Sequence, residues 1–159
     1  MMYPTPPVDP SQALAALDRL LPALHRSLAE YLSYATPWTP PGCEALGEAI
    51  ARVAADHRWY CERLVSAIRA LGGIPQFGEF PSRYSDMHDL AINYSARQLA
   101  DELRGSLSLI EDCVAATAGV ACARELAEEI LGNTRGHLEA LERLLSVGYA
   151  SEVGQAPRA

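Results

Sequence analysis

The chain has 159 residues, of which 49% are hydrophobic, and this length and composition predict one globular domain with a substantial core. Its formal net charge of −7 argues against nucleic acid or an anionic membrane as a partner. None of the four cysteines are spaced as C-x-x-C, and the start of the chain has no apolar signal segment. We therefore expect reduced thiols, a cytoplasmic location and no membrane association.

The first predicted helix follows a proline-rich start. Residues 1–11 are expected to form a flexible arm, because they contain four prolines. Apolar residues then recur at steps of three and four over residues 14–35, which predicts an amphipathic helix. Pro22 lies inside this pattern and lacks a backbone donor, so a kink or break is expected near Leu20. The proline-rich residues 36–42 predict a short turn, which favours antiparallel neighbours.

A second helix is predicted from about Cys43 to Leu71, with His57 on its apolar stripe. The glycines and proline of residues 72–75 stop it. The chain then shows no clear period over a crossover of about residues 72–94. A loop of this length is uncommon inside a compact domain. It fits a chain that travels the length of a bundle before a second helical hairpin begins.

Two further helices are predicted in the second half of the chain. The third covers about residues 92–114, and the fourth is centred on residues 124–146 and ends at Gly148. Residues 148–159 are expected to form a flexible tail. The second and fourth helices share the pattern H-x4-E-R-L-[V/L]-S, which starts at His57 in one and at His137 in the other. These features predict an all-α bundle of two antiparallel hairpins joined by a long crossover.

Two short strings strengthen this fold prediction. They are Leu71-Gly72-Gly73-Ile74-Pro75 after the second helix and Gly136-His137-Leu138-Glu139-Ala140-Leu141-Glu142 in the fourth. With the crossover and the repeat, they resemble the ferritin-like superfamily, especially bacterioferritins and rubrerythrins, over roughly residues 12–147. The resemblance implies a ferritin-like four-helix bundle with two irons in its core. Helices one and three would each supply a Glu, and helices two and four a Glu-x-x-His pair.

This sequence departs from that ligand pattern in the second and fourth helices. Thr134 stands three residues before His137, where the resemblance would place a glutamate. Ala54 stands at the matching position before His57. Alignment on the glycine-glycine-proline string instead puts His57 at the glutamate position and Tyr60 at the histidine position. The register of the second helix stays open, and neither register yields Glu-x-x-His.

The first and third helices also offer few ligands. Ser27 stands near the expected glutamate of the first helix, with Glu30 on the outer side of its stripe. We therefore expect a degenerate set in place of the usual two-iron site, sufficient for a single iron or another divalent metal. The candidate metal ligands are His57, His137 and Glu102, with Asp101 and Tyr60 as weaker candidates.

Two functions remain open at this point. The first is a ferritin-like protein with a reduced or atypical core metal site, for which no reaction is predicted. The second is a metal-free bundle that serves as a structural, dimerisation or partner-binding module, in which each core histidine is neutral and hydrogen-bonded to neighbours such as Thr134 or Tyr60. A homodimer is the simplest expected assembly. No haem is expected, because no methionine stands at the position where bacterioferritins bind haem. Arg58 is the nearest equivalent in this sequence.

Overall fold

The structure is a computed structural model that describes residues 9–153, with side chains described as far as residue 148. Most of the predicted arm, residues 1–8, and the tail residues 154–159 lie outside the described residues. The elements in chain order are α1 (Ser11–His25), α2 (Leu28–Ala35), α3 (Glu44–Ala70), the 3-10 helix η1 (Ser82–Met87), α4 (Ile92–Ala116) and α5 (Ala121–Val153). No helix of the described part is long and apolar enough to cross a bilayer.

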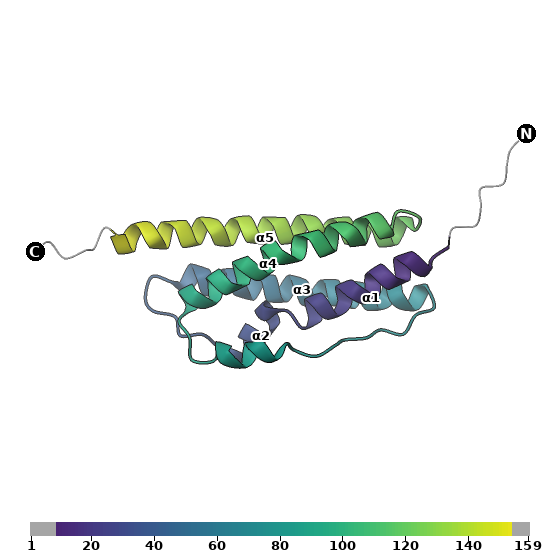
Figure 1. Ribbon diagram of the computed structural model, residues 1–159. Helices are drawn as coiled ribbons and strands as arrows, with labels where there is room; N and C mark the ends of the chain where they lie inside the picture. The colour runs from purple at the N-terminus through teal and green to yellow at the C-terminus, as the bar shows by residue number, and fades with distance from the viewer. Residues whose placement is uncertain (1–8, 154–159) are drawn as a thin grey trace, which may run out of the picture.

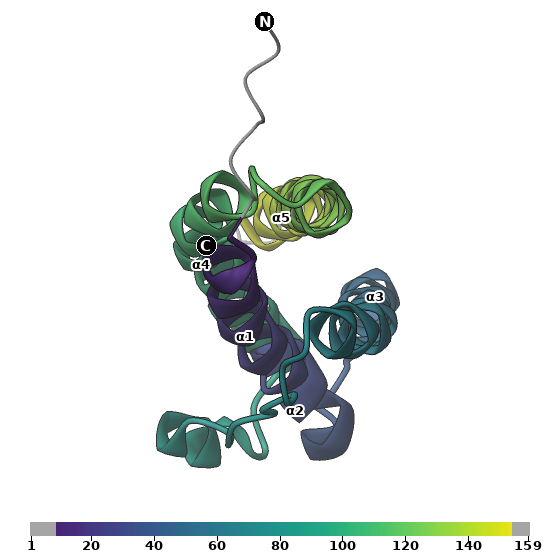
Figure 2. The ribbon, with the colours of Figure 1, turned by 90° about the vertical axis from the view of Figure 1, so that its right-hand side faces the viewer.

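The helices form the predicted arrangement of two hairpins. In Figure 1, α3, α4 and α5 run along the length of the molecule, and α1 lies beside α3. Figure 2 looks down this length and shows α1, α3, α4 and α5 around a common centre, with α2 and η1 at one edge. The crossover between α3 and α4 runs along the outer side of α1 before it forms η1. The all-α fold with a long crossover is therefore confirmed.

The first predicted helix is divided in two, but not at the expected place. Helix α1 continues through Pro22 to His25, and the backbone N–H of Arg26 still bonds the carbonyl of Pro22 at 3.0 Å. The chain leaves the helical conformation at Ser27, whose φ of −70° and ψ of 160° are those of extended backbone. Ser27 Oγ then accepts a hydrogen bond from the N–H of Glu30 at 3.3 Å and caps α2. The break lies at the residue that can cap the next helix.

The ends of α3 and α5 differ in how glycine acts. Gly72 adopts a φ of +81° just after α3, and the helix stops there as predicted. Gly148 was expected to end the last helix, but α5 continues to Val153. A glycine inside a helix costs about 1 kcal/mol relative to alanine and ends the helix only when it takes the left-handed conformation. Gly148 does not take it.

The core consists of two apolar clusters with polar residues between them. One cluster joins α2, the first half of α3 and α4, and the end of α5, and the other joins α1, the second half of α3 and α4, and the start of α5. Four segments of the chain contribute to both clusters: α1 with α2, α3, α4 and α5. Each of them has a polar residue at the point where it passes from one cluster to the other. We call these four residues the polar layer: Ser27, His57, Ser106 and Thr134.

Candidate functional site

His57 occupies the centre of the polar layer. Its side chain comes from the middle of α3, is 4% exposed, and places Nδ1 2.8 Å from Ser27 Oγ. Its other ring nitrogen, Nε2, is buried and has no hydrogen-bond partner among the described residues. Burial, with a smaller contribution from the charge of His137, lowers the pKa of His57 to about 4. The ring is therefore neutral at physiological pH.

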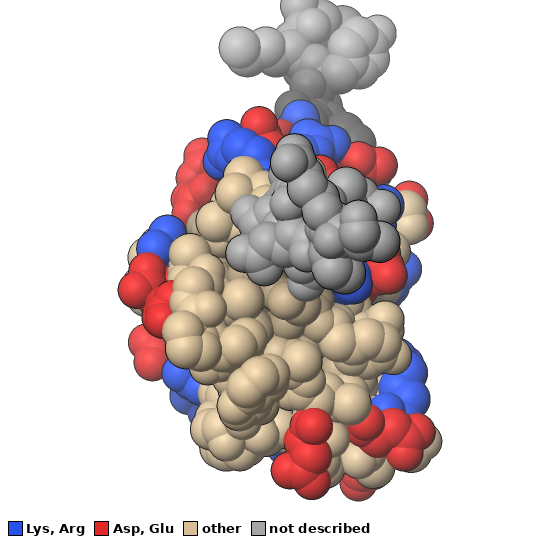
Figure 3. Space-filling view, turned by 90° about the vertical axis from the view of Figure 1, so that its left-hand side faces the viewer, with Lys and Arg blue, Asp and Glu red and all other residues tan. Residues whose placement is uncertain are grey.

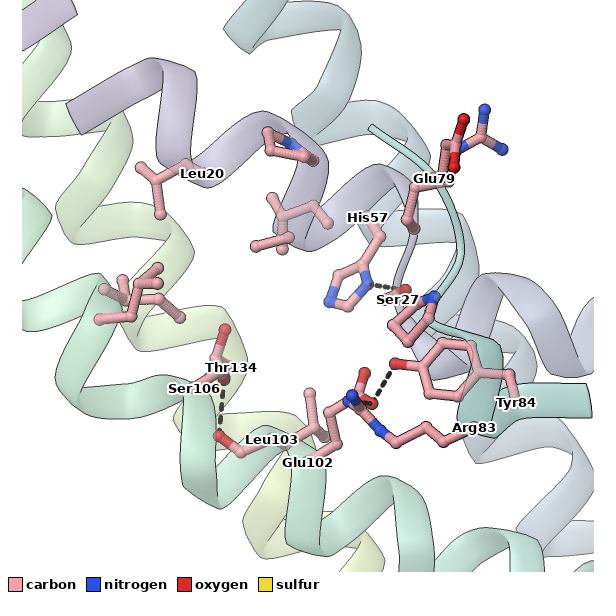
Figure 4. Close-up of a pocket in the computed structure, with 17 residues that line it drawn as sticks. Leu20, Ser27, His57, Glu79, Arg83, Tyr84, Glu102, Leu103, Ser106 and Thr134 are labelled. Carbon is pink, nitrogen blue, oxygen red and sulfur yellow. Dashed lines mark hydrogen bonds and ion pairs between the residues drawn. The ribbon is translucent and has the colours of Figure 1, made fainter. Parts of the chain in front are cut away.

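A cavity of about 240 Å³ lies beside the ring of His57. Figure 4 shows the imidazole pointing into the space between α1 and α4, with Thr134 and Ser106 across from it. Residues 79–84 of the crossover close one side. The wall is mainly aliphatic and is formed by Leu20, Leu24, Leu103, Leu109 and Ile110. The cavity reaches the surface where Ala23 and Arg83 are exposed.

Glu102 also lines this cavity, but its carboxylate is fully engaged. One oxygen accepts the backbone N–H of Leu28 at 2.8 Å. The other accepts the hydroxyl of Tyr84 and lies 3.6 Å from the guanidinium of Arg83. Burial, followed by the bond to Glu102, raises the pKa of Tyr84 well above its usual range, so the phenol keeps its proton. Glu102 therefore acts as the negative group at the N-terminus of α2.

His137 belongs to a separate polar contact between α3 and α5. Its Nε2 lies 2.7 Å from Asp56 Oδ2, and Asn133 Nδ2 donates to the same oxygen at 2.8 Å. Burial raises the pKa of Asp56, but the hydrogen bonds from Asn133 and His137 outweigh it and hold this pKa below its usual value. His137 does not line the cavity. Neither core histidine bonds Thr134 or Tyr60: His57 bonds Ser27 and His137 bonds Asp56.

The two weaker candidate ligands also lie away from the cavity. Asp101 is exposed on α4 and pairs with Arg104 at 2.8 Å. Tyr60 packs in the cluster around α1, where the guanidinium of Arg63 lies over its ring. Neither residue lines the cavity beside His57. Of the five predicted ligands, the structure brings His57 and Glu102 to one cavity and places the others elsewhere.

The residues present do not fit a two-iron centre. Such a centre in this type of bundle takes four carboxylates and two histidines, because two buried cations need several negative oxygen ligands. Here two carboxylates line the cavity: Glu79 is exposed, and both oxygens of Glu102 have partners. Within residues 9–153, no group of three histidine, cysteine, aspartate or glutamate side chains is placed to hold a metal ion.

Sequence reasoning missed two residues of these contacts and misjudged a third. Asp56 was not predicted. The available signal was that Asn133 and His137 are four residues apart on one face of α5, where both can reach one partner on a neighbouring helix. The cap at Ser27 also has a signal, since Ser27-Leu28-Ala29-Glu30 is a capping-box pattern. Tyr84 comes from the crossover, where no periodic pattern indicates which side chains turn inward.

Comparison with solved structures identifies the fold. The chain is similar to the bacterioferritin-related protein of Bacteroides fragilis, described as a dodecameric thioferritin, with 15% identity and a TM-score of 0.75 over 94% of each chain. This similarity shows that the chain has the ferritin-like fold, as its sequence predicted. No protein-family model and no curated protein matches the sequence.

Proposed function

We propose that this ferritin-like chain is a self-associating bundle that acts through its surface and does not oxidise iron at a two-metal core site. The bonding of Glu102 supports this proposal most directly. The carboxylate that could have served as a ligand instead joins α2, η1 and α4. A homodimer is the simplest assembly. The proposal also places the chain in the cytoplasm, where Cys43, Cys61, Cys113 and Cys122, which form no disulfide, would stay reduced.

One end of the bundle offers a surface for association. Figure 3 shows a continuous area of uncharged residues there, with acidic and basic side chains at its rim. Two exposed aromatic residues come from segments that meet at this end, Trp38 at 65% exposure and Tyr94 at 48%. Trp38 is tied to the start of α4 by its bridge to Ala91. Because each chain carries a charge of −7, two copies repel least where such a face meets its equivalent.

The assembly of the similar protein gives further support, since the Bacteroides fragilis protein is dodecameric. Light scattering coupled to size-exclusion chromatography, over a range of concentrations, tests self-association of our chain. We expect a dimer that Trp38→Glu and Tyr94→Glu dissociate. Trp59→Glu is the matched control, because Trp59 is 52% exposed but lies midway along α3. A monomer at every concentration, or equal effects of all three substitutions, would contradict the proposal.

The proposed lack of ferroxidase activity has its own test. The protein is mixed anaerobically with two equivalents of ferrous iron and then exposed to dioxygen, and formation of ferric iron is followed by absorbance. We expect the rate to equal that of the buffer. Rapid oxidation of two irons per chain that is lost in Glu102→Ala would show that a two-metal site assembles and would overturn this part of the proposal.

A second candidate function is the binding of a single divalent metal by two of the predicted ligands, His57 and Glu102. It is supported by the placement of His57 Nε2 and Glu102 at the same cavity. Elemental analysis after loading with ferrous or cobalt ions tests it. One metal per chain, lost in His57→Ala and retained in His137→Ala, would establish the site. His137→Ala is the control because His137 lies outside the cavity.

A further inference from the structure

The hydrogen bonds of Ser27 fix how His57 presents itself to the cavity. Ser27 Oγ already accepts the backbone N–H of Glu30. Its hydroxyl hydrogen needs an acceptor, since Ser27 is buried, and Nδ1 of His57 is its one available partner among the described residues. The arrangement that satisfies both groups has Ser27 donating to Nδ1. A neutral imidazole with an acceptor at Nδ1 carries its hydrogen on Nε2.

This tautomer makes His57 a hydrogen-bond donor toward the cavity. A metal ion would need the lone pair of Nε2, which exists only when Nδ1 carries the hydrogen. In that tautomer both Nδ1 and the Glu30 N–H would donate to Ser27 Oγ, and the buried hydroxyl hydrogen would lose its acceptor. An unsatisfied buried donor is destabilising. The tautomer with its hydrogen on Nε2 also leaves one buried donor without a partner among the described residues, but that donor points into the cavity, where an acceptor on a bound molecule can satisfy it. The geometry therefore favours a ligand with a hydrogen-bond acceptor over a metal at this nitrogen.

The two polar groups across the cavity from His57 can act as acceptors. Thr134 Oγ1 donates its hydrogen to the carbonyl of Ile130 at 2.8 Å. Ser106 Oγ likewise donates to the carbonyl of Leu103 at 2.8 Å. Each hydroxyl oxygen keeps lone pairs that can accept a further hydrogen bond. A bound group that both accepts from His57 and donates to one of these oxygens would satisfy the polar layer from inside the cavity.

The charge and size of the cavity restrict the ligand further. The ring of His57 is neutral, and the carboxylate of Glu102 has its partners. The other charged lining residues, Arg26, Glu79 and Arg83, are partly or fully exposed, so an ionic group buried beside His57 would lack an adjacent counter-charge. The volume of about 240 Å³ exceeds the 150 Å³ or so that holds benzene in an engineered apolar cavity. By that ratio it accommodates about ten non-hydrogen atoms.

We propose that this cavity binds a small uncharged molecule with one hydroxyl group on an apolar body, such as a phenol or a compact alcohol. Its oxygen accepts the Nε2–H of His57, and its hydrogen is donated to the hydroxyl oxygen of Thr134. The aliphatic wall surrounds the apolar body. This site is independent of self-association, because it lies inside the bundle and away from the uncharged end.

The tautomer of His57 is the first test, and it needs no ligand. Long-range nitrogen–proton NMR correlation of the wild-type protein at neutral pH distinguishes the two ring nitrogens. We expect Nε2 to carry the hydrogen, and Ser27→Ala to make the Nδ1-protonated form more populated. A wild-type ring protonated at Nδ1, or a doubly protonated ring at neutral pH, would overturn the proposal.

Probe binding is the second test, measured by calorimetry and by chemical-shift changes of residues at the cavity. The probes are p-cresol, toluene, which lacks the hydroxyl group, and benzoate, which is charged. We expect p-cresol to bind at least tenfold more tightly than either of the others. His57→Phe and Thr134→Val should weaken p-cresol, whereas His137→Gln should leave it unchanged. Equal binding of p-cresol and toluene, or no binding of p-cresol at millimolar concentration, would overturn the proposal.

Thr134→Val keeps the side-chain volume and preserves the test if His57→Phe does not fold. Cobalt titration with the nitrogen shifts of His57 as readout separates the two ligand classes. A cobalt-induced shift at Nε2 without p-cresol binding would replace the proposal by the single-metal site. Neither result depends on the oligomeric state, so failure of this proposal is distinguishable from failure of self-association.

Discussion

Leu28, the first residue of α2, donates its backbone N–H to the carboxylate of Glu102 on α4 at 2.8 Å. This contact joins a helix start, where the backbone N–H groups carry partial positive charge, to a negative side chain from a distant part of the sequence. A short helix of eight residues is marginal by itself. The contact with Glu102 therefore helps to hold α2 against the bundle.

Replacement of Glu102 tests this contact. We expect Glu102→Ala to lower the free energy of unfolding by about 2 kcal/mol, because the N–H of Leu28 and the hydroxyl of Tyr84 lose their acceptors. Glu102→Gln keeps an acceptor and should cost about 1 kcal/mol. Urea unfolding measures both. Asp101→Ala is the control, expected to stay within about 0.5 kcal/mol because Asp101 is exposed. Equal effects at the two positions would contradict this account.

The buried histidine predicts a dependence of stability on pH. The pKa of His57 is lowered by burial from 6.5 to about 4, so between these values the unfolded chain binds more protons than the folded one. The free energy of unfolding should therefore fall as the pH is lowered through this range, by up to about 3 kcal/mol from this residue. His57→Gln should lack that component when its urea-unfolding curve is compared with the wild type at each pH. Parallel losses in both proteins would contradict it.

The contact between Asp56 and His137 should couple α3 to α5. A double-mutant cycle with Asp56→Ala and His137→Ala is expected to give a coupling of about 1 kcal/mol, since the pair is 2.7 Å apart and half-shielded from water. The exposed pair of Glu48 and Arg52, 3.6 Å apart, is the matched control and should give less than about 0.5 kcal/mol. A coupling no larger than that of the control would show that this part-buried contact is not stabilising.

Two glycines should respond oppositely to alanine. A Cβ atom at Gly73 would lie 2.5 Å from a methyl carbon of Leu14 and 2.9 Å from one of Ile68, so Gly73→Ala should destabilise the fold by about 1–3 kcal/mol. Gly105 lies within α4 with open space around it, and Gly105→Ala should stabilise the fold by about 0.5–1 kcal/mol. Thermal unfolding measures both. A neutral Gly73→Ala would show that the turn after α3 adjusts without strain.

Most of the fold could be predicted from the sequence because periodic apolar residues determine it locally. Helix α3 was expected over residues 43–71 and spans Glu44–Ala70, and the crossover follows from the glycine and proline signals after it. The position of the helix break was missed because proline indicates only that a break is near. The cap formed by Ser27 determines where it lies.

The candidate site was less predictable, because its geometry depends on which long-range partner each polar residue finds. His57 and His137 occupy equivalent places in the sequence repeat, yet one faces a cavity and the other an aspartate on α3. On α5 the member of the polar layer is Thr134, one helical turn before His137. A sequence repeat indicates similar helices but does not determine how each is rotated in the bundle.

The bonded state of Glu102 has a consequence for how the protein matures. A core lined with several free carboxylates is held apart by their repulsion until cations arrive. Here the carboxylate meets a helix start, a phenol and a guanidinium that all belong to the same chain. This part of the core therefore needs no metal ion to neutralise its carboxylate, because the chain itself supplies the groups that do so.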